Sequence, residues 1–323
     1  MSGQWRALRR RLLTPDLSEA SFDKRGFRAH DLASQTQLET VGRTFLAGFG
    51  FAAEATGPAH AQRLLDTVDK PLRGFAYEGA AMCFAILDAI GLRGGRIREF
   101  LAGGGRQHVY MVHVGMGWAL ARLPRPLWRR ALPADPLLGW LALDGYGFHQ
   151  AYFHTERYVR RQYQDPSFAW PLDARQAAAH RVIDQGIGRA LWFVEGADVD
   201  RLATTIEGFA PARHADLFAG AGLAATYAGG VGRTELESLR RRAGRYVPQL
   251  AQGSAFGAEA RLLAGLTTSH TALATDVLCG MTPQRAAAVT DAARIDLTDG
   301  GPAPDYEIWR QRIATQFASS GRY

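Results

Sequence analysis

Short glycine-containing segments recur about a hundred residues apart in this sequence, and the repetition limits the folds that the chain can adopt. The segment Gly48–Phe51, with sequence GFGF, returns 97 residues later as Gly145–Phe148, with sequence GYGF. The segment Gly115–Ala119 (GMGWA) returns 105 residues later as Gly220–Ala224 (GAGLA). Solenoid repeats have shorter periods, of about 20–50 residues. We therefore expect two similar half-domains packed face to face around a pseudo-two-fold axis, with a ligand cleft between them.

Helical periodicity fills most of the chain, whereas the alternating patterns typical of strands are scarce. The expected helices include residues 36–66 with a break at 56–58, 75–90, 97–101, 108–123, 173–194, 197–209, 215–228 and 234–246, and one around Trp309. The sequence therefore predicts a mainly α fold with few or no strands, built from internally duplicated helical halves.

The repeat also suggests boundaries along the chain. We expect an N-terminal arm (1–35), a first repeat half (36–135), a second repeat half (136–232), and a C-terminal partial repeat and tail (233–323). The partial third copy is expected because Leu263–Leu266 resembles Leu46–Phe49. Prolines at 124, 126, 133 and 136 mark the boundary between the halves.

The net charge and the cysteine content limit the kinds of binding partner and the cellular compartment that we expect for this protein. The formal net charge is +7, and arginine supplies almost all of the positive charge because Lys24 and Lys70 are the only lysines. The arginine clusters are scattered along the chain, which argues against a nucleic-acid surface and favours the codon bias of a GC-rich genome. Cys83 and Cys279 are too few for a disulfide framework and lie in apolar stretches, as reduced core residues of a cytoplasmic protein do.

The N-terminus leaves two interpretations open. It has no apolar signal core, and the chain has no run of 18 or more uncharged apolar residues, so neither a secretory signal nor a spanning helix is expected. Trp5, Leu8 and Leu12 share one helical face with arginines around them. Such a helix either docks on an anionic membrane surface or packs against the body of the protein. We expect a cytoplasmic protein, with peripheral attachment to the inner face of the membrane as the alternative.

The Gly-x-Gly steps do not predict a nucleotide site. Gly48-x-Gly50-x-x-Ala53 resembles a loose dinucleotide fingerprint, but that motif needs a preceding strand. Here the glycines fall inside a helical pattern, where they either turn the chain or let helices approach closely. The sequence also has no zinc spacing, P-loop, nucleophile elbow or kinase signature, so no cofactor is recognisable from motifs.

His149 is the first candidate catalytic residue. It directly follows the repeated segment Gly145–Phe148 and stands where the first copy has the small Ala52. The spacing of five between His149 and His154 does not place both rings on one helical face, so no metal site is expected there. The alternative is a structural histidine with satisfied hydrogen bonds.

Glu78 and Arg189 are the other catalytic candidates, and they lie in matching blocks of the two copies. Glu78 interrupts an apolar stretch, where a carboxylate must pair, become neutral or serve chemistry. Arg189 is its expected partner, in an ion pair joining the halves or in a site at the pseudo-symmetry axis. The candidate substrate-binding residues are Tyr77, His113, Trp118, Tyr146, Phe148, Tyr152, Asp184 and Trp192.

Four blocks resemble a known bacterial family. They are Phe75–Met82, His113–Ala119, Asp144–His149 and Asp184–Phe193. Together they resemble the UnbL-type family of unknown function found in enediyne biosynthetic gene clusters, over about residues 20–300. The resemblance implies a gene beside an iterative polyketide synthase, a membrane protein resembling an electron-transport subunit and a large repeat protein. It supplies no catalytic residues.

The resemblance implies a role in enediyne natural-product biosynthesis, in which a linear polyketide-derived polyene or polyyne matures into the enediyne core. The chain would then be a tailoring enzyme, or a subunit of a catalytic complex, for a desaturation, halogenation or cyclisation step. The alternative is a non-catalytic protein that binds the polyene and delivers it to a membrane-bound partner. A haem protein with His113 or His149 as axial ligand is a third hypothesis.

Overall fold

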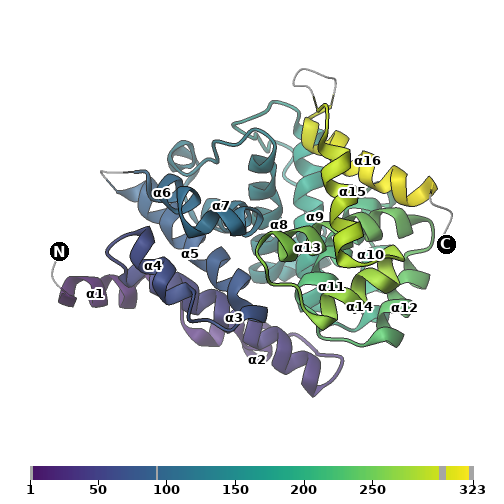
Figure 1. Cartoon of the computed structure of the whole chain (residues 1–323), viewed down its shortest axis with the longest axis horizontal. Coiled ribbons are helices and arrows are strands. Elements are labelled where there is room, and N and C mark those ends of the chain that lie inside the picture. Colours follow the sequence, from purple (N-terminus) through teal and green to yellow (C-terminus); the bar gives the residue numbers. More distant parts are fainter. Residues whose placement is uncertain (1–2, 92–93, 298–302, 320–323) are drawn as a thin grey trace. The chain divides into compact units, whose positions relative to one another are not determined.

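The computed structural model describes residues 3–91, 94–297 and 303–319, which form helices joined by loops (Figure 1). Within these ranges there is no β-strand, and the one extended pairing is an isolated bridge between Trp170 and Asp173. The prediction of a mainly α fold is therefore confirmed. The pseudo-two-fold relation between two duplicated halves stays a prediction.

The chain divides into two compact units, and each is described by itself. The first unit consists of Met1–Gly26 and Glu39–Tyr146, and the second of Phe27–Leu38 and Gly147–Tyr323. Helices α3 (Leu32–Glu54) and α8 (Leu141–Phe153) contribute residues to both units. The four-part division expected from the sequence stays a prediction.

The first unit contains most of the helices expected before residue 146. Besides parts of α3 and α8, it contains α1 (Gly3–Leu13), α2 (Phe22–Arg25), α4 (Pro58–Leu65), α5 (Lys70–Ile90), α6 (Arg96–Ala102) and α7 (Val109–Arg122). The predicted break after α3 is present, because α4 begins at Pro58, whose missing N–H suits a first helical position. Short 3₁₀ segments at Leu17–Ala20, Gly104–His108, Arg125–Arg130 and Leu138–Trp140 join these helices.

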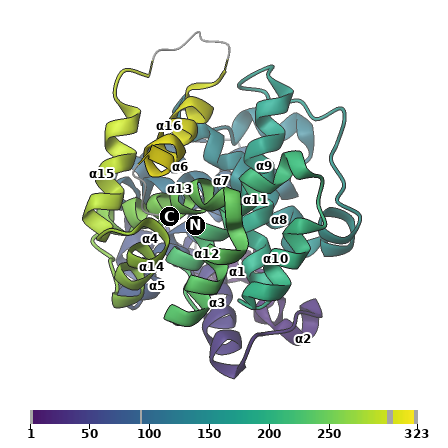
Figure 2. The same ribbon diagram turned by 90° about the vertical axis from the view of Figure 1, so that its right-hand side faces the viewer.

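The second unit is built around α13. Its helices are α9 (Gln176–Val194), α10 (Val199–Glu207), α11 (His214–Tyr227), α12 (Arg233–Ala243), α13 (Val247–Leu263), α14 (Ser269–Cys279), α15 (Pro283–Arg294) and α16 (Asp305–Ser319). Single turns at Glu156–Arg160, Pro211–Arg213 and Gly244–Tyr246 complete it. Helix α13 packs against α11, α14, α15 and α16 (Figure 2).

Helix α13 was not predicted from the sequence, and the segment at its end differs in local structure from its expected counterpart. Buried polar residues such as Gln252, Ser254 and Glu259 interrupt its apolar face, so its periodicity is weak. Leu263–Leu266, expected to match Leu46–Phe49, forms the turn that ends α13, with Gly265 at φ +66°. Leu46–Phe49 lies instead in the middle of α3. The two segments share letters but not local structure.

The Gly-x-Gly steps lie inside helices and let neighbouring helices approach closely. Residues two apart on an α-helix point about 200° apart, so the two glycines face opposite sides. On α7, a Cβ added to Gly115 would lie 2.2 Å from the carbonyl oxygen of Glu78 on α5. A Cβ added to Gly117 would lie 1.9 Å from the carbonyl oxygen of Ala142 on α8. Helix α7 is therefore held between α5 and α8 at distances that only glycine permits.

Helix α11 repeats this arrangement in the second unit. A Cβ on Gly220 would lie 2.0 Å from the carbonyl oxygen of Gln185 on α9, and one on Gly222 would lie 2.0 Å from that of Leu250 on α13. Gly48 likewise faces α5 from the interior of α3, with 2.0 Å between its added Cβ and the carbonyl oxygen of Ala76. The recurring glycines thus encode helix packing, and a phosphate-binding loop is not formed at Gly48.

The N-terminal helix packs against the end of α3. Arg9 donates from Nε to the carbonyl oxygen of Ala53 at 2.5 Å, and Arg10 pairs with Glu54 at 2.6 Å. Cations near the last turn of a helix interact favourably with its carbonyl dipoles. Leu8 and Leu12 remain exposed, and the side chain of Trp5 lies outside the described part of the structure. None of the described helices is both long and apolar enough to cross a membrane.

Both cysteines are buried and free, as the sequence predicts. Cys83 lies on α5 and Cys279 ends α14. Burial disfavours the thiolate and raises the pKa of each thiol to about 12. Neither thiol is therefore an activated nucleophile at neutral pH.

Candidate functional site

Two predicted site residues meet in the core of the first unit. Glu78 on α5 is 2% exposed, and its Oε1 accepts a hydrogen bond from the indole Nε1–H of Trp118 on α7 at 3.0 Å. The indole reaches Glu78 because Gly115 lets α7 lie directly against the α5 backbone. The predicted partner Arg189 belongs to the second unit, so the Glu78–Arg189 ion pair stays a prediction.

Tyr77 forms a second polar contact in the first unit, facing a histidine that the sequence analysis did not select. Its hydroxyl donates to Asp66 Oδ1 at 2.8 Å, and its ring stacks on His108 with 3.7 Å between centroids. Burial lowers the pKa of His108 to about 4, so its imidazole is neutral at physiological pH. Its Nδ1 has no hydrogen-bond partner among the described residues.

His113 and Tyr146 make local packing contacts in the same unit. The Nδ1–H of His113 donates to the carbonyl oxygen of Val109 one turn earlier on α7, at 2.8 Å. Burial lowers the pKa of His113, which favours the neutral imidazole. Tyr146 on α8 packs edge-on against Trp128, with 5.7 Å between ring centroids.

In the second unit, the end of α8 forms an aromatic cluster, which we define as Phe148, Tyr152, Phe153 and Phe193. Phe148 stacks on Tyr152 with 5.9 Å between centroids and meets Phe193 edge-on at 5.3 Å. Tyr152 in turn meets Phe153 at 5.0 Å. Side chains from α8 and α9 therefore form one continuous and largely buried group of aromatic rings.

His149 and Arg189 both border this cluster. The ring of His149 lies 4.7 Å from that of Phe153 and is 5% exposed. The guanidinium carbon of Arg189 lies 5.2 Å from the ring centroid of Phe148, within the range of a cation–π contact. The structure thus brings two of the three predicted catalytic residues beside two predicted substrate-binding residues, Phe148 and Tyr152.

Asp184 and Trp192, also predicted to bind substrate, have structural partners in the second unit. Asp184 accepts two hydrogen bonds from Arg213, at 2.9 Å from Nε and 2.6 Å from Nη2. Burial raises the pKa of Asp184 to about 6 although Arg213 opposes the rise, so the carboxylate is ionised at neutral pH. The indole of Trp192 donates to the carbonyl oxygen of Gly229 at 2.9 Å and so anchors the glycine linker after α11.

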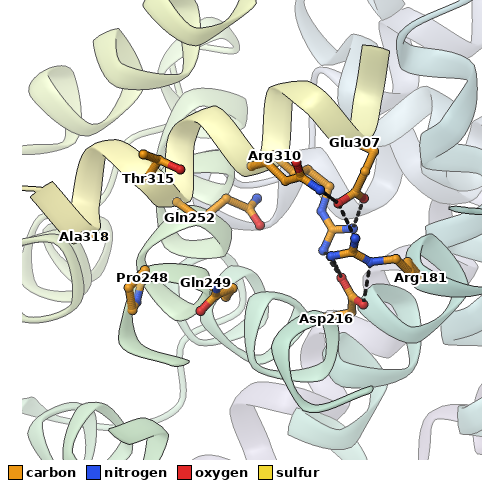
Figure 3. Close-up of a pocket in the computed structure, with 11 residues that line it drawn as sticks. Arg181, Asp216, Pro248, Gln249, Gln252, Glu307, Arg310, Thr315 and Ala318 are labelled. Atoms are coloured by element: carbon orange, nitrogen blue, oxygen red, sulfur yellow. Dashed lines mark hydrogen bonds and ion pairs between the residues drawn. The ribbon is translucent and has the colours of Figure 1, made fainter. Parts of the chain in front are cut away.

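The second unit also contains a charged cavity that was not predicted from the sequence (Figure 3). It has a volume of about 270 Å³ and lies among α9, α11, α13 and α16. Its lining includes Arg181, Asp216, Gln249, Gln252, Glu307 and Arg310. These residues come from distant parts of the sequence and share no spacing or repeat that could have shown that they meet.

Metal ligation finds no support in the described ranges. They contain no group of three or more His, Cys, Asp or Glu side chains arranged to hold a metal ion. The rings of His149 and His154 are 6.2 Å apart between centroids. The haem hypothesis for His113 or His149 stays a prediction.

Comparison with known proteins places the chain in a family. No curated protein and no solved structure matches it. A family model described as "Protein of unknown function (DUF1702)" matches residues 4–317. This range spans both units and all four blocks singled out from the sequence. The chain therefore belongs to the DUF1702 family.

Proposed function

We propose that this chain acts in enediyne biosynthesis, where it helps to turn a linear polyketide-derived polyene or polyyne into the enediyne core. The proposal is carried by the resemblance of its four long blocks to the UnbL-type family. Those blocks supply the buried Glu78–Trp118 pair in one unit and the His149 and Arg189 neighbourhood in the other. The part of the sequence that carries the resemblance is thus also the part richest in buried polar and aromatic groups.

The aromatic cluster supports the choice of substrate class. A conjugated polyene is flat, apolar and polarizable, and aromatic faces and edges contact such molecules favourably. Phe148 and Tyr152 carry such faces and edges close to His149, in a buried cluster that a polyene would have to enter. A polyene that lies against them would have an imidazole within reach and a guanidinium at the Phe148 side.

His149 is the group that we propose to move protons, because an imidazole can accept a proton at one ring nitrogen and donate one from the other. Arg189, in the same unit, would orient a substrate carboxylate. Glu78, in the first unit, stays a candidate acid or base. A cyclisation conserves the oxidation level of the polyene. A desaturation or halogenation needs an oxidant, which a partner such as the membrane protein of the same gene cluster would supply.

The second candidate is a carrier that shields the polyene and delivers it to that membrane protein. The cluster favours it as much as it favours an enzyme, because a binding surface needs no catalytic residue. The N-terminal helix, with exposed Leu8 and Leu12 beside its arginines, is where contact with a membrane partner would be made.

Gene replacement in a producing strain tests both candidates. We would delete the gene, complement it with wild type, His149→Ala, Glu78→Gln or the control His154→Ala, and compare extracts by mass spectrometry. His154 is the matched control because it lies on the same segment but is exposed. For an enzyme, His149→Ala accumulates the same linear intermediate as the deletion while His154→Ala restores the product, with normal protein levels in every strain.

The opposite outcomes are equally informative. If both His149→Ala and Glu78→Gln restore the enediyne, whereas Phe148→Ala with Tyr152→Ala does not, the carrier is the better description. If the deletion strain still makes the enediyne, the proposed role in this pathway is wrong.

A further inference from the structure

One wall of the cavity between α13 and α16 consists of charged side chains that all pair with one another. Arg310 donates to Asp216 at 2.6 Å and to Glu307 at 3.2 Å. Arg181 contacts the same two carboxylates, at 3.2 Å from Asp216 and 2.7 Å from Glu307 (Figure 3). Two guanidinium groups thus bind two carboxylates, and the formal charges of this wall sum to zero. We call these four residues the ionic ring.

The ionic ring leaves no net charge with which to attract an ion. Asp216 and Glu307 each use both oxygens on the two arginines, so neither carboxylate is left for a cation. Burial alone would lower the pKa of Arg310, but Asp216 and Glu307 raise it above its ordinary value. Arg310 therefore stays charged and neutralised, and the cavity suits an uncharged ligand.

Three polar atoms of the cavity lining remain without a hydrogen-bond partner among the described residues. They are Nε2 of Gln252, Nε of Arg310 and Oε1 of Gln249. Gln252 is 1% exposed, and its amide lies between α13 and α16 in the cavity (Figure 3). An unsatisfied buried donor or acceptor costs about 1–3 kcal/mol, so native proteins normally give such atoms a partner. The lining side chains thus carry two donors and one acceptor that have no partner among the described residues.

We propose that this cavity binds a small uncharged molecule through a carboxamide group. The carbonyl oxygen of an amide accepts from Gln252 and Arg310, and its N–H donates to Gln249. Pro248, Ala314 and Ala318 in the lining leave room for a short apolar stem. The side chain of Arg181 is 41% exposed, so it borders the cavity where the cavity meets solvent. This site is independent of the proposed polyene function.

Three fragments of nearly equal shape test the charge and hydrogen-bond pattern: propionamide, propionate and propylammonium. Their binding to the full chain is measured by saturation-transfer NMR and by the shift in melting temperature. For a molecule of this size we expect a dissociation constant in the millimolar range, roughly 1 mM or weaker. Propionamide should bind at least about tenfold more tightly than either ion, a difference of about 1.4 kcal/mol.

Substitutions localise the binding. Gln252→Leu removes the amide and Gln252→Glu replaces its donors with acceptors, so each should weaken propionamide binding about tenfold or more. Gln316→Leu, an exposed position on α16 outside the cavity lining, should leave binding unchanged. Circular dichroism of each variant checks that the fold is kept, and Gln252→Glu covers the case in which Gln252→Leu fails to fold.

Several outcomes would overturn the proposal. If no fragment binds at concentrations of about 10 mM, well above the expected constant, the cavity holds only water. Equal or tighter binding of propionate would make it an anion site instead. Propionamide binding that survives both Gln252 variants would place the site elsewhere on the chain.

Discussion

Helices α7 and α11, one in each unit, use glycines in the same way but have different chemistry beside them. Helix α7 in the first unit and α11 in the second each present two glycines to opposite neighbours. On α7 the nearby polar contact is a hydrogen bond from the indole of Trp118 to Glu78. On α11 it is ionic, because Asp216 binds Arg181 and Arg310.

The repeat itself shows where the two helices diverge. With the offset of 105 residues, Asp216 corresponds to Met111 and Trp118 corresponds to Leu223. The glycines are thus kept while the polar residues are exchanged. Gly-x-Gly thus sets the spacing of the helices, whereas the side chains beside it decide which polar groups meet there.

The largest effect is expected from breaking the ionic ring. Arg310→Met removes one of the two guanidinium groups that neutralise the buried carboxylates of Asp216 and Glu307, and should lower the free energy of unfolding by about 3–5 kcal/mol. Urea denaturation followed by circular dichroism measures this. The exposed Arg285→Met on α15 is the control, with an expected change within about 0.5 kcal/mol. A loss below about 1 kcal/mol for Arg310→Met would show that the ring does not stabilise the second unit.

Replacing a glycine at a close helix contact should lower the stability by a similar amount in both units. Gly117→Ala and Gly222→Ala each place a Cβ 1.9–2.0 Å from a backbone oxygen, so the helices must separate. We expect each to cost about 3 kcal/mol, more than the roughly 1 kcal/mol that alanine gains in helix propensity. Gly50→Ala is the control, because its nearest neighbours are the side chains of Arg10 and Thr14 at 3.3 Å and beyond.

The stability losses of these variants show whether close glycine packing matters equally in both units. The common role in helix packing is supported if Gly117→Ala and Gly222→Ala lower the free energy of unfolding equally. Gly50→Ala should then be neutral or stabilising. A large loss in one unit only would mean that the other can widen its helix spacing at little cost.

The buried titratable groups should give opposite pH dependences. The pKa of His108 is lowered to about 4, so the native state resists its protonation and stability falls as pH falls from about 6.5 to 4. The pKa of Asp184 is raised to about 6, so the native state binds its proton more readily and its contribution falls as pH rises from about 4 to 6.

Denaturation between pH 4 and 7 tests these signs. Relative to wild type, His108→Gln should gain up to about 3 kcal/mol as pH falls through this range. Asp184→Asn should show a difference from wild type that changes in the reverse direction. A His108 imidazole that titrates near 6.5 by NMR would contradict its buried, neutral state.

The smallest effect is expected from the hydrogen bond between Trp118 and Glu78 in the first unit. Trp118→Phe removes the donor to Glu78 and should cost about 2 kcal/mol, since it also shrinks a buried side chain. Pairing it with Glu78→Gln in a double-mutant cycle isolates the hydrogen bond. A coupling energy near zero would show that Glu78 depends on its other contacts instead.

Much of the fold was predictable because it is written in local patterns. The break at Pro58 and the end of α5 at Gly91 follow from backbone preferences of single residues. Helix α13 was not predictable in this way. Its buried Gln252 and Glu259 look like surface residues until their neighbours are known.

The candidate sites also differ in how far their contacts could be predicted from the sequence. His149, Phe148 and Tyr152 lie within five residues of one another, so their proximity at the end of α8 could be inferred from the sequence. The partner of Asp184 could not, because Arg213 is 29 residues away and many arginines were available.

The sequence by itself determined the helical class, most helix boundaries and the positions where helices approach closely, because these depend on backbone freedom and periodicity over a few residues. Only the tertiary structure decided which charges pair. It brought Arg181, Asp216, Gln252 and Arg310 into one cavity across four helices, because a buried charge is satisfied by whichever partner the packing places within hydrogen-bonding distance.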